Sequence, residues 1–160
     1  MEDTLIILKP DALQRRLVGR ILTRFEEKGL IIAAMKLVQL RREVVEEHYA
    51  VHRERPFYPG LVRYMTSHPV VPLVLRGRRA VEVCRKLLGA THGYEAQPGT
   101  IRGDFGISKS MNLVHASDSP ESASKEIPLF FQSYEILSAK PADLPWVYDP
   151  WEELGDQDRP

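Results

Sequence analysis

The chain has 160 residues, 43% of them hydrophobic, which fits a single compact domain with its own core. Lysine plus arginine and aspartate plus glutamate number 22 each, so the formal net charge is zero. This balance argues against a dedicated nucleic-acid surface, which usually carries an excess of basic residues. It leaves room for a local basic pocket around a small phosphorylated ligand.

The cysteine content and the N-terminal residues indicate in which cellular compartment the protein is expected. Cys84 is the only cysteine, which excludes an intramolecular disulfide and a cysteine-rich metal site. The sequence starts Met-Glu-Asp-Thr without a basic leader and contains no run of about 18 apolar residues. We therefore expect a cytoplasmic protein with no membrane partner, in which Cys84 is a buried structural thiol.

The first half of the chain alternates between strand and helix patterns. The apolar run Thr4–Leu8 predicts a buried strand. Apolar residues then recur with helical spacing from Leu17 to Phe25, and Gly29 is placed to end that helix. The remaining elements of this half are a strand at Leu30–Leu40 and short helices at Glu43–Val51 and Phe57–Thr66.

The second half holds two more strands and a long connection. Val70–Leu75 predicts a strand, and its Pro72 favours an edge position or a bulge, because proline cannot donate to a ladder. Gly89–Met111 reads as a long irregular stretch, which in a compact domain is usually functional. The other predicted elements are a helix at Arg79–Leu88, a strand at Asn112–Ala116 and a helix capped by Ser119 with Pro120 in its first turn.

This order of elements predicts an α+β fold of the ferredoxin-like class, an α/β sandwich with a βαββαβ core. Its sheet is expected to have four antiparallel strands, with extra helices and a long loop before the last strand. We assign residues 1–145 to this domain and residues 146–160 to a C-terminal arm with a disordered end. Because both tryptophans, Trp146 and Trp151, lie in the arm, we expect it to dock on a surface or a neighbouring subunit.

Candidate phosphate-binding groups lie near strand ends and loops. The sequence has no Walker A loop, paired catalytic carboxylates or metal-ligand spacing. Lys9 closes the first strand, Arg102 stands between two glycines, and Arg85 and Thr91 flank a helix-to-loop transition. Each of these residues is by itself more often a solvated surface group, so none indicates a function alone.

His115 lies in the segment Asn112-Leu-Val-His-Ala-Ser-Asp-Ser119, at the end of a predicted strand. Alternation predicts Leu113 and His115 on one face and Asn112 and Val114 on the other. A helix begins shortly afterwards, and helix N-termini favour anions. On these residues alone, a buried structural histidine is still the commoner case.

Four segments of the chain stand out when taken together. They are Ile7-Leu-Lys-Pro-Asp11, Arg55-Pro-Phe-Tyr-Pro-Gly-Leu61, Gly99-Thr-Ile-Arg-Gly-Asp-Phe105 and Asn112-Leu-Val-His-Ala-Ser-Asp-Ser119. They resemble the signatures of the nucleoside diphosphate kinase family, in the family's order and with compatible spacing, and the resemblance extends to about Tyr148. The last segment, which contains the histidine, is the most specific, and four segments in register make coincidence negligible.

The resemblance implies a ping-pong transfer of the γ-phosphoryl group from a nucleoside triphosphate to a nucleoside diphosphate, with broad tolerance of base and sugar. His115 would be the nucleophile, oriented by Glu126 with Ser117 behind it, and Tyr49 would assist at the phosphates. The remaining nucleotide-binding residues carried over are Lys9, Arg85, Thr91 and Arg102 for the phosphates, Asn112 for the sugar, and Phe57 and Leu61 for the base.

The resemblance also implies a cofactor and partners. Mg²⁺ is expected on the phosphates of the nucleotide rather than on protein ligands. The implied partners are nucleoside di- and triphosphates and further copies of the chain, in a hexamer rather than a tetramer. The alternatives are a phosphohistidine carrier and a non-enzymatic ferredoxin-like binding module. A carrier would have no use for Phe57, Thr91 and Asn112, and it would not exchange phosphate between free nucleotides.

Three positions depart from the family's pattern. Lys109 stands where an apolar residue usually lies beside the base, which leaves base preference open. Gly93, after His92, replaces a proline, so we expect a looser loop. Pro128 removes one helical hydrogen bond, so we expect the helix after Glu126 to end early or kink.

Overall fold

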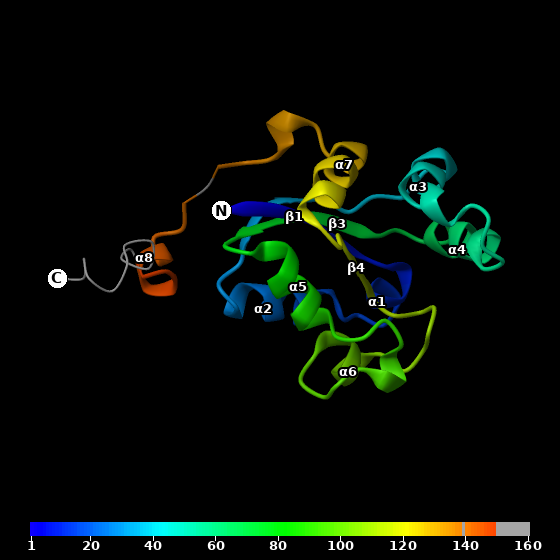
Figure 1. Ribbon diagram of the computed structural model, residues 1–160, viewed down its shortest axis with the longest axis horizontal. Helices are drawn as coiled ribbons and strands as arrows, with labels where there is room; N and C mark the ends of the chain where they lie inside the picture. Colours follow the sequence, from blue (N-terminus) through cyan, green and yellow to red (C-terminus); the bar gives the residue numbers. More distant parts are fainter. Residues whose placement is uncertain (139, 150–160) are drawn as a thin grey trace.

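The computed structural model describes residues 1–138 and 140–149, which form a four-stranded antiparallel sheet with helices on both faces (Figure 1). The strand order is β2-β3-β1-β4. The strands are β1 (Glu2–Leu8), β2 (Ile31–Met35), β3 (Val71–Gly77) and β4 (Val114–Ala116). Both outer strands come second in their βαβ halves, so the predicted ferredoxin-like α+β fold is confirmed.

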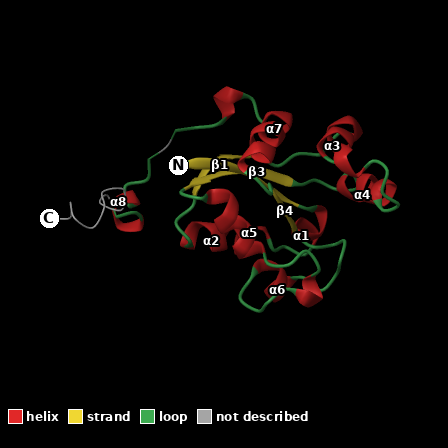
Figure 2. Cartoon of the chain, viewed as in Figure 1, coloured by secondary structure: helices red, strands yellow, loops and turns green. Residues whose placement is uncertain are grey.

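The helices divide between the two faces of the sheet (Figure 2). Helices α2 (Val18–Glu27) and α5 (Ala80–Leu88) pack on one face, whereas α3 (Arg42–His48) and α7 (Pro120–Phe130) cover the other. The remaining helical segments are α1 (Pro10–Gln14), α4 (Tyr58–Met65), α6 (Ile101–Phe105), α8 (Leu144–Val147) and the 3₁₀ turns η1 (Ala50–His52), η2 (Gly93–Glu95) and η3 (Ser133–Glu135).

The central strand β1 explains why the core has two halves. Ile6 and Leu8 belong to the apolar cluster under α2 and α5, whereas Leu5 and Ile7 belong to the cluster under α7. All four side chains are fully buried. Successive side chains of a strand point to opposite faces, so this continuous apolar run fills both. β1 therefore forms a rigid base beside which β4 is paired.

Two predictions about the α5 region are confirmed. Gly89 follows the helix with a φ of 79°, a left-handed conformation that glycine adopts without steric cost. Cys84 is completely buried among apolar side chains, and burial raises the pKa of its thiol to about 12. Cys84 is thus a structural thiol. Gly29 ends α2 in the same way, with a φ of 85°.

The position predicted for the strand with Pro72 is wrong. β3 lies between β2 and β1 rather than at an edge, and the register shift occurs in β2, between Ile32 and Ala34. Proline is tolerated because the regular pairing of β3 with β2 ends at the pair Met35–Leu73, one residue short of Pro72. The missing N–H therefore falls where that ladder has already ended.

Other boundaries also differ from the predictions. β2 ends at Met35; beyond it the Lys36 N–H donates to Pro72 O at 3.2 Å and Val38 pairs with Val70 as an isolated bridge. The connection after Gly89 is not irregular throughout, because it contains η2 and α6. Helix α7 passes through Pro128 and ends at Phe130, less than one turn later, which is compatible with the early end expected after Glu126.

The described part of the C-terminal arm returns to its own chain. The Tyr148 hydroxyl accepts a hydrogen bond from the Arg78 N–H at 3.3 Å, and the Arg78 guanidinium lies 5.1 Å from the centre of the tyrosine ring. Trp146, in contrast, is 93% exposed. The predicted disorder of the arm's end and the predicted role of Trp151 lie outside the described residues. Among those residues, no helix has the length and apolar character needed to cross a membrane.

Candidate active site

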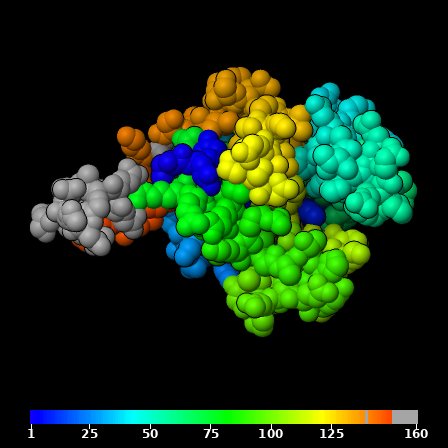
Figure 3. Space-filling view, in the orientation of Figure 1, coloured from blue at the N-terminus to red at the C-terminus, as the bar shows by residue number. Residues whose placement is uncertain are grey.

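Polar side chains gather where β4 meets α7 and faces α3 and α6. In the space-filling view, the α3–α4 region (cyan), the α7 region (yellow) and the α6 region (green) border one another, with a small part of the N-terminal segment (blue) visible between them (Figure 3). The site thus brings β4 and α7 together with α3, α6 and the N-terminal segment, which are far apart in the sequence. The site is built by tertiary packing rather than by one motif.

A tight turn at Leu113 sets where β4 begins. Its φ is 71°, a left-handed conformation that is costly for a bulky side chain, and the Val114 N–H bonds to Asn112 O at 2.8 Å. The predicted alternation from Asn112 onward is therefore wrong. Leu113 packs in the same core cluster as Val114, on the face opposite His115. The turn leaves His115 alone to point toward α7 and α3.

Asp11, which the sequence reasoning missed, holds this turn. Its buried carboxylate accepts a hydrogen bond from the Leu113 N–H at 3.1 Å and another from the Tyr64 hydroxyl. The Lys9 N–H donates to Leu113 O at 2.8 Å. Lys9 and Asp11 lie about a hundred residues from Leu113 in the sequence. The sequence marks them only through their place in the segment that ends at Asp11, which resembles a family signature.

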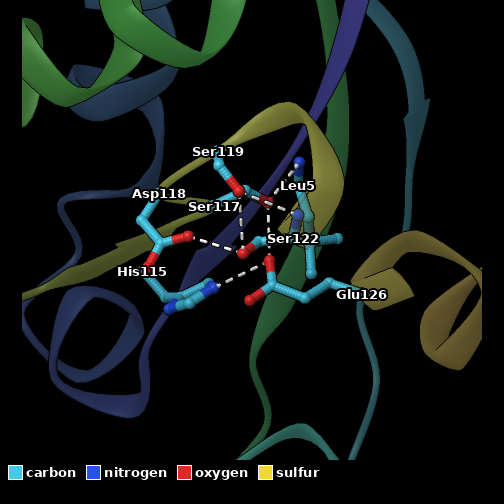
Figure 4. A network of polar contacts seen from close by, with 7 residues as sticks. All are labelled: Leu5, His115, Ser117, Asp118, Ser119, Ser122 and Glu126. Atoms are coloured by element: carbon cyan, nitrogen blue, oxygen red, sulfur yellow. Dashed lines mark hydrogen bonds and ion pairs between the residues drawn. The ribbon is translucent and has the colours of Figure 1, made fainter. Parts of the chain in front are cut away.

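His115 forms a chain of polar contacts with Glu126 and Ser117 (Figure 4). Its Nε2 lies 3.3 Å from Glu126 Oε2, which also accepts a hydrogen bond from Ser117 Oγ at 2.5 Å. The Leu5 N–H donates to Ser117 Oγ at 3.2 Å. An ionised carboxylate only accepts, so this contact places the imidazole proton on Nε2. The Nδ1 lone pair is then left for a ligand.

Charge and burial favour a neutral histidine beside an ionised glutamate. Burial lowers the pKa of His115 below its ordinary value of 6.5, Glu126 opposes this shift, and Lys9 and Arg85 reinforce it. For Glu126, burial alone would raise the pKa, but hydrogen bonds from His115 and Ser117 hold it below its ordinary 4.5. At neutral pH the pair can therefore offer an uncharged nucleophile with an anion behind it.

Two aromatic residues from the end of α3 pack against His115. The ring of His48 lies 4.5 Å from that of His115 and the ring of Tyr49 6.0 Å from it, both nearly perpendicular. Both nitrogens of His48 and the hydroxyl of Tyr49 are buried, and none of these atoms has a hydrogen-bond partner among residues 1–138 and 140–149. Burial, reinforced by His115, lowers the pKa of His48 to about 3, and burial raises that of Tyr49. Tyr49 was predicted, whereas His48 was missed.

Lys9 and Asn112 form a buried polar pair near the turn. Lys9 Nζ donates to Asn112 Oδ1 at 2.7 Å, and the amide nitrogen of Asn112 donates to the carbonyls of Thr91 at 3.0 Å and Lys109 at 3.2 Å. Burial and the nearby Arg102 lower the pKa of Lys9 to about 8, well below the ordinary 10.5. An anion beside this ammonium would relieve that penalty.

Arg102 is the structural centre of the loop before β4. Its guanidinium donates to three backbone carbonyls, those of Asn112 at 3.1 Å, Gly89 at 3.1 Å and Val114 at 2.6 Å. Burial and the charge of Arg85 lower its pKa to about 10. Arginine has five N–H donors, so some stay available for a ligand. Arg85 and Thr91 are exposed at the end of α5 and just beyond it.

Phe57 and Leu61 lie on a separate side of the site, at the start of α4. Phe57 is 55% exposed, and its ring lies 5.4 Å from that of His52, which stacks at 6.4 Å on Tyr49. Leu61 follows Phe57 by one helical turn and is partly buried against the second core cluster. The exposed ring of Phe57 is thus connected to His115 through a row of aromatic residues.

The loop that carries Gly93 is packed tightly, contrary to the expected looseness. The Gly93 N–H donates to Ser108 O at 3.2 Å. A Cβ at this position would lie 2.5 Å from the backbone carbon of Gly106. A proline could supply no N–H and would clash, so glycine here permits close contact between two backbone segments.

Comparisons with known proteins agree with one another. A family model described as nucleoside diphosphate kinase matches residues 2–136. A nucleoside diphosphate kinase of Archaeoglobus fulgidus is 54% identical over 149 residues, 93% of this chain and 99% of the relative. That of Thermoplasma acidophilum is 54% identical over 136 residues, 85% of this chain and 92% of the relative.

Solved structures give the same result. A halophilic nucleoside diphosphate kinase from Halobacterium salinarum, solved in complex with CDP, has a TM-score of 0.91 and 42% identity, and the match covers 92% of this chain and 99% of the other. The apo enzyme from Encephalitozoon cuniculi has a TM-score of 0.89 and 45% identity, with 92% and 100% covered.

Proposed function

The chain belongs to the nucleoside diphosphate kinase family and is a phosphotransferase that acts between nucleotides, and we propose that His115 carries the phosphoryl group between the two half-reactions. The observation that supports this most strongly is the contact between His115 Nε2 and Glu126 at 3.3 Å. It leaves Nδ1 with a lone pair, on a side chain that is 19% exposed. A neutral imidazole next to an anion is the state in which histidine is a nucleophile.

The chemical step uses Nδ1 of His115. Nδ1 attacks the γ-phosphorus of a bound triphosphate, a P–N bond forms, and the bond from the γ-phosphorus to the bridging oxygen breaks, which releases the diphosphate. Positive charge develops on the ring during attack, and the Glu126 carboxylate stabilises the Nε2–H. A β-phosphate oxygen of a second diphosphate then attacks phosphohistidine, and the ring returns to its neutral state. Ser117 fixes Glu126 through its 2.5 Å hydrogen bond.

Three cations are suited to hold the phosphates. Lys9 and Arg102 are buried, and the loss of solvent destabilises their charged forms. An incoming anion would offset this destabilisation. Arg85 is exposed and can reach outward from α5. Thr91 and the Tyr49 hydroxyl would add neutral donors, and the hydroxyl has no hydrogen-bond partner among the described residues. Such preorganised donors stabilise charge on the transferring group without reorganisation.

The remaining residues are assigned to the base and sugar. The exposed ring of Phe57 can stack on any base, which accounts for a broad base range, with Leu61 one helical turn away. Asn112 would bind a sugar hydroxyl other than the 2′-hydroxyl, so both ribonucleotides and deoxyribonucleotides could bind. Lys109 is exposed next to Asn112 and its methylenes can pack beside the base.

A divalent cation takes part in catalysis by this family, and we assign it as Mg²⁺ on the nucleotide phosphates. Within the described residues, the group best suited to a metal is His48, His115 and Glu126, with two nitrogens and one carboxylate. Mg²⁺ prefers six oxygen ligands, so this group does not suit it. When bound through the phosphates, Mg²⁺ neutralises charge that develops during transfer.

We also retain the finer expectations from the sequence. The family domain is residues 1–145 with a following arm, the chain acts in the cytoplasm, and it assembles as a hexamer. The exposed Trp146 supports an arm that contacts a neighbouring subunit, because tryptophan is enriched at protein–protein interfaces relative to the rest of the surface.

The function is tested by a pulse and chase. The protein is incubated with Mg²⁺ and γ-labelled ATP, and unlabelled GDP is then added. We expect acid-labile label on the wild type, recovered as GTP, and no label on His115→Gln, which should still bind ADP. Label that no diphosphate can remove would indicate a phosphohistidine carrier instead. Robust turnover by His115→Gln would exclude His115 as the nucleophile.

A further inference from the structure

The proposed reaction gives His48 no task, yet its ring lies 4.5 Å from that of the nucleophile. Both of its ring nitrogens are shielded from solvent, and neither has a hydrogen-bond partner within the part of the chain that the structure describes. Leaving such groups unpaired costs free energy, so buried polar atoms of this kind usually mark a ligand or a functional state. The nearest chemically complementary groups are His115 and Glu126.

These three side chains have the composition of a transition-metal site. One potential ligand atom from each of His48, His115 and Glu126 lies within 4.8 Å of the other two. Two imidazoles and a carboxylate, with a fourth position open, is a ligand set that suits Zn²⁺. Mg²⁺ would not compete well, because it prefers oxygen ligands in octahedral geometry.

One of the ligand distances already suits a metal ion. Ligands at about 2.1 Å from a tetrahedral ion lie roughly 3.4 Å apart. Nε2 of His115 and Oε2 of Glu126 are 3.3 Å apart. His48 offers the third ligand atom within 4.8 Å of the other two. Because its nitrogens have no hydrogen-bond partner among the described residues, a turn of the ring toward an ion breaks no hydrogen bond there. Side chains of His115 and Glu126 are 19% and 18% exposed, so an ion can reach them from solvent.

We propose that His48, His115 and Glu126 form an inhibitory binding site for Zn²⁺ or a similar transition-metal ion. The metal takes the Nε2 lone pair of His115, and the ring proton moves through water from Nε2 to Nδ1. The imidazole stays neutral, but Nδ1 no longer has a lone pair with which to attack phosphorus. The nearby positive charges of Lys9 and Arg85 oppose the ion, so the site favours metals with high affinity for imidazole.

Zinc binding is measured first by isothermal titration calorimetry, without nucleotide and in excess Mg²⁺. Wild type is compared with His48→Gln and with His68→Gln, an exposed histidine outside the cluster. We expect one zinc site in wild type and His68→Gln, and at least about tenfold weaker binding in His48→Gln, since one ligand is lost. Wild-type affinity in a folded His48→Gln, or no zinc binding to wild type, would overturn the proposal.

A second measurement needs no variant. Crystals of the wild type soaked in zinc give anomalous scattering at the zinc edge, which should place the ion between His48, His115 and Glu126. An ion found only elsewhere would contradict the site, even if His48→Gln failed to fold.

The inhibitory consequence rests on the proposed function, whereas zinc binding does not, so the two can fail separately. We expect Zn²⁺ to suppress labelling of His115 by γ-labelled ATP at a fixed excess of Mg²⁺, and a chelator to restore it. Zinc bound at the cluster with undiminished labelling would refute the inhibition alone.

Discussion

In the proposed mechanism the reactivity of His115 depends on one carboxylate. The contact with Glu126 places a proton on Nε2, and Glu126 raises the pKa of the ring while burial and two cations lower it. With attack assigned to the neutral form, we expect the rate to be fully present above the folded-state pKa and to be lost as the pH falls through it. With the pKa below 6.5, the rate should still be near its plateau at neutral pH.

We expect Glu126→Ala to slow phosphoryl transfer by a factor of roughly 10–1,000, as loss of a positioning group often does. Glu126→Gln keeps the size but removes the charge that raises the pKa of His115. The acid limb of its pH–rate profile should therefore move to lower pH. Pre-steady-state labelling across the pH range measures both effects. An unchanged rate and an unmoved acid limb would show that Glu126 does not act on His115.

Lys9 should take up a proton when a diphosphate binds. Its pKa is lowered to about 8 by burial and by Arg102, so at pH 8 about half of the unliganded protein carries a neutral lysine. A neighbouring phosphate favours the ammonium form and raises that pKa. Calorimetric titration with ADP at pH 8, in buffers of different ionisation enthalpy, should show uptake of about half a proton.

The control for this titration is Lys9→Met, which has a similar length and no titratable group. Nucleotide binding to the variant should lack the proton uptake assigned to Lys9. Equal uptake in both proteins would mean that another group titrates.

At the scale of secondary-structure elements, hydrophobic periodicity predicted the strands and helices that have local causes. It did not predict the features that depend on unusual backbone conformations or on distant residues. The apolar run of β1 and the helical spacing before Gly29 have local causes, and both elements are where they were expected. The start of β4 depends on the conformation of Leu113, which distant Asp11 stabilises. Similarly, Pro72 is tolerated in the central strand β3 because the pairing of β3 with β2 ends next to it. No local sequence pattern reveals where that pairing ends.

The residues of the candidate site also differ in how far the sequence alone reveals them. His115, Glu126 and Lys9 stand in or near segments that resemble a family, so the sequence alone suffices to propose them as site residues. His48 belongs to no such segment, and its place beside His115 results from packing of α3 against α7. Residues whose importance comes from three-dimensional proximity have no sequence signal to find.

Gly93 offers a test of packing between η2 and the segment after α6. Gly93→Ala should lower the free energy of unfolding by about 1–3 kcal/mol, because its Cβ would meet the backbone at Gly106. Gly19→Ala is the matched control, since nothing lies within 4 Å of a Cβ there and alanine favours the interior of α2. Thermal unfolding of the three proteins measures this. Equal stability of Gly93→Ala and wild type would show that the loop relaxes freely.

At the scale of the whole molecule, the arm and its exposed aromatic residue point to assembly. Tyr148 is held by its own chain, whereas Trp146 is 93% exposed and can reach a neighbour. We expect sedimentation equilibrium to give six times the 18.3 kDa mass of one chain. Trp146→Ala should weaken this assembly if the arm contributes. A wild-type protein that stays monomeric at micromolar concentration would exclude the predicted oligomer.

The most direct test of the account is the chemical identity of the phosphorylated atom. The protein is phosphorylated with Mg²⁺ and ATP, and nuclear magnetic resonance that correlates phosphorus with the imidazole ring assigns the isomer. Because Nε2 of His115 faces Glu126, we predict that the phosphoryl group is on Nδ1. Phosphate on Nε2, or on a serine in place of His115, would contradict the orientation on which the mechanism and the metal site both depend.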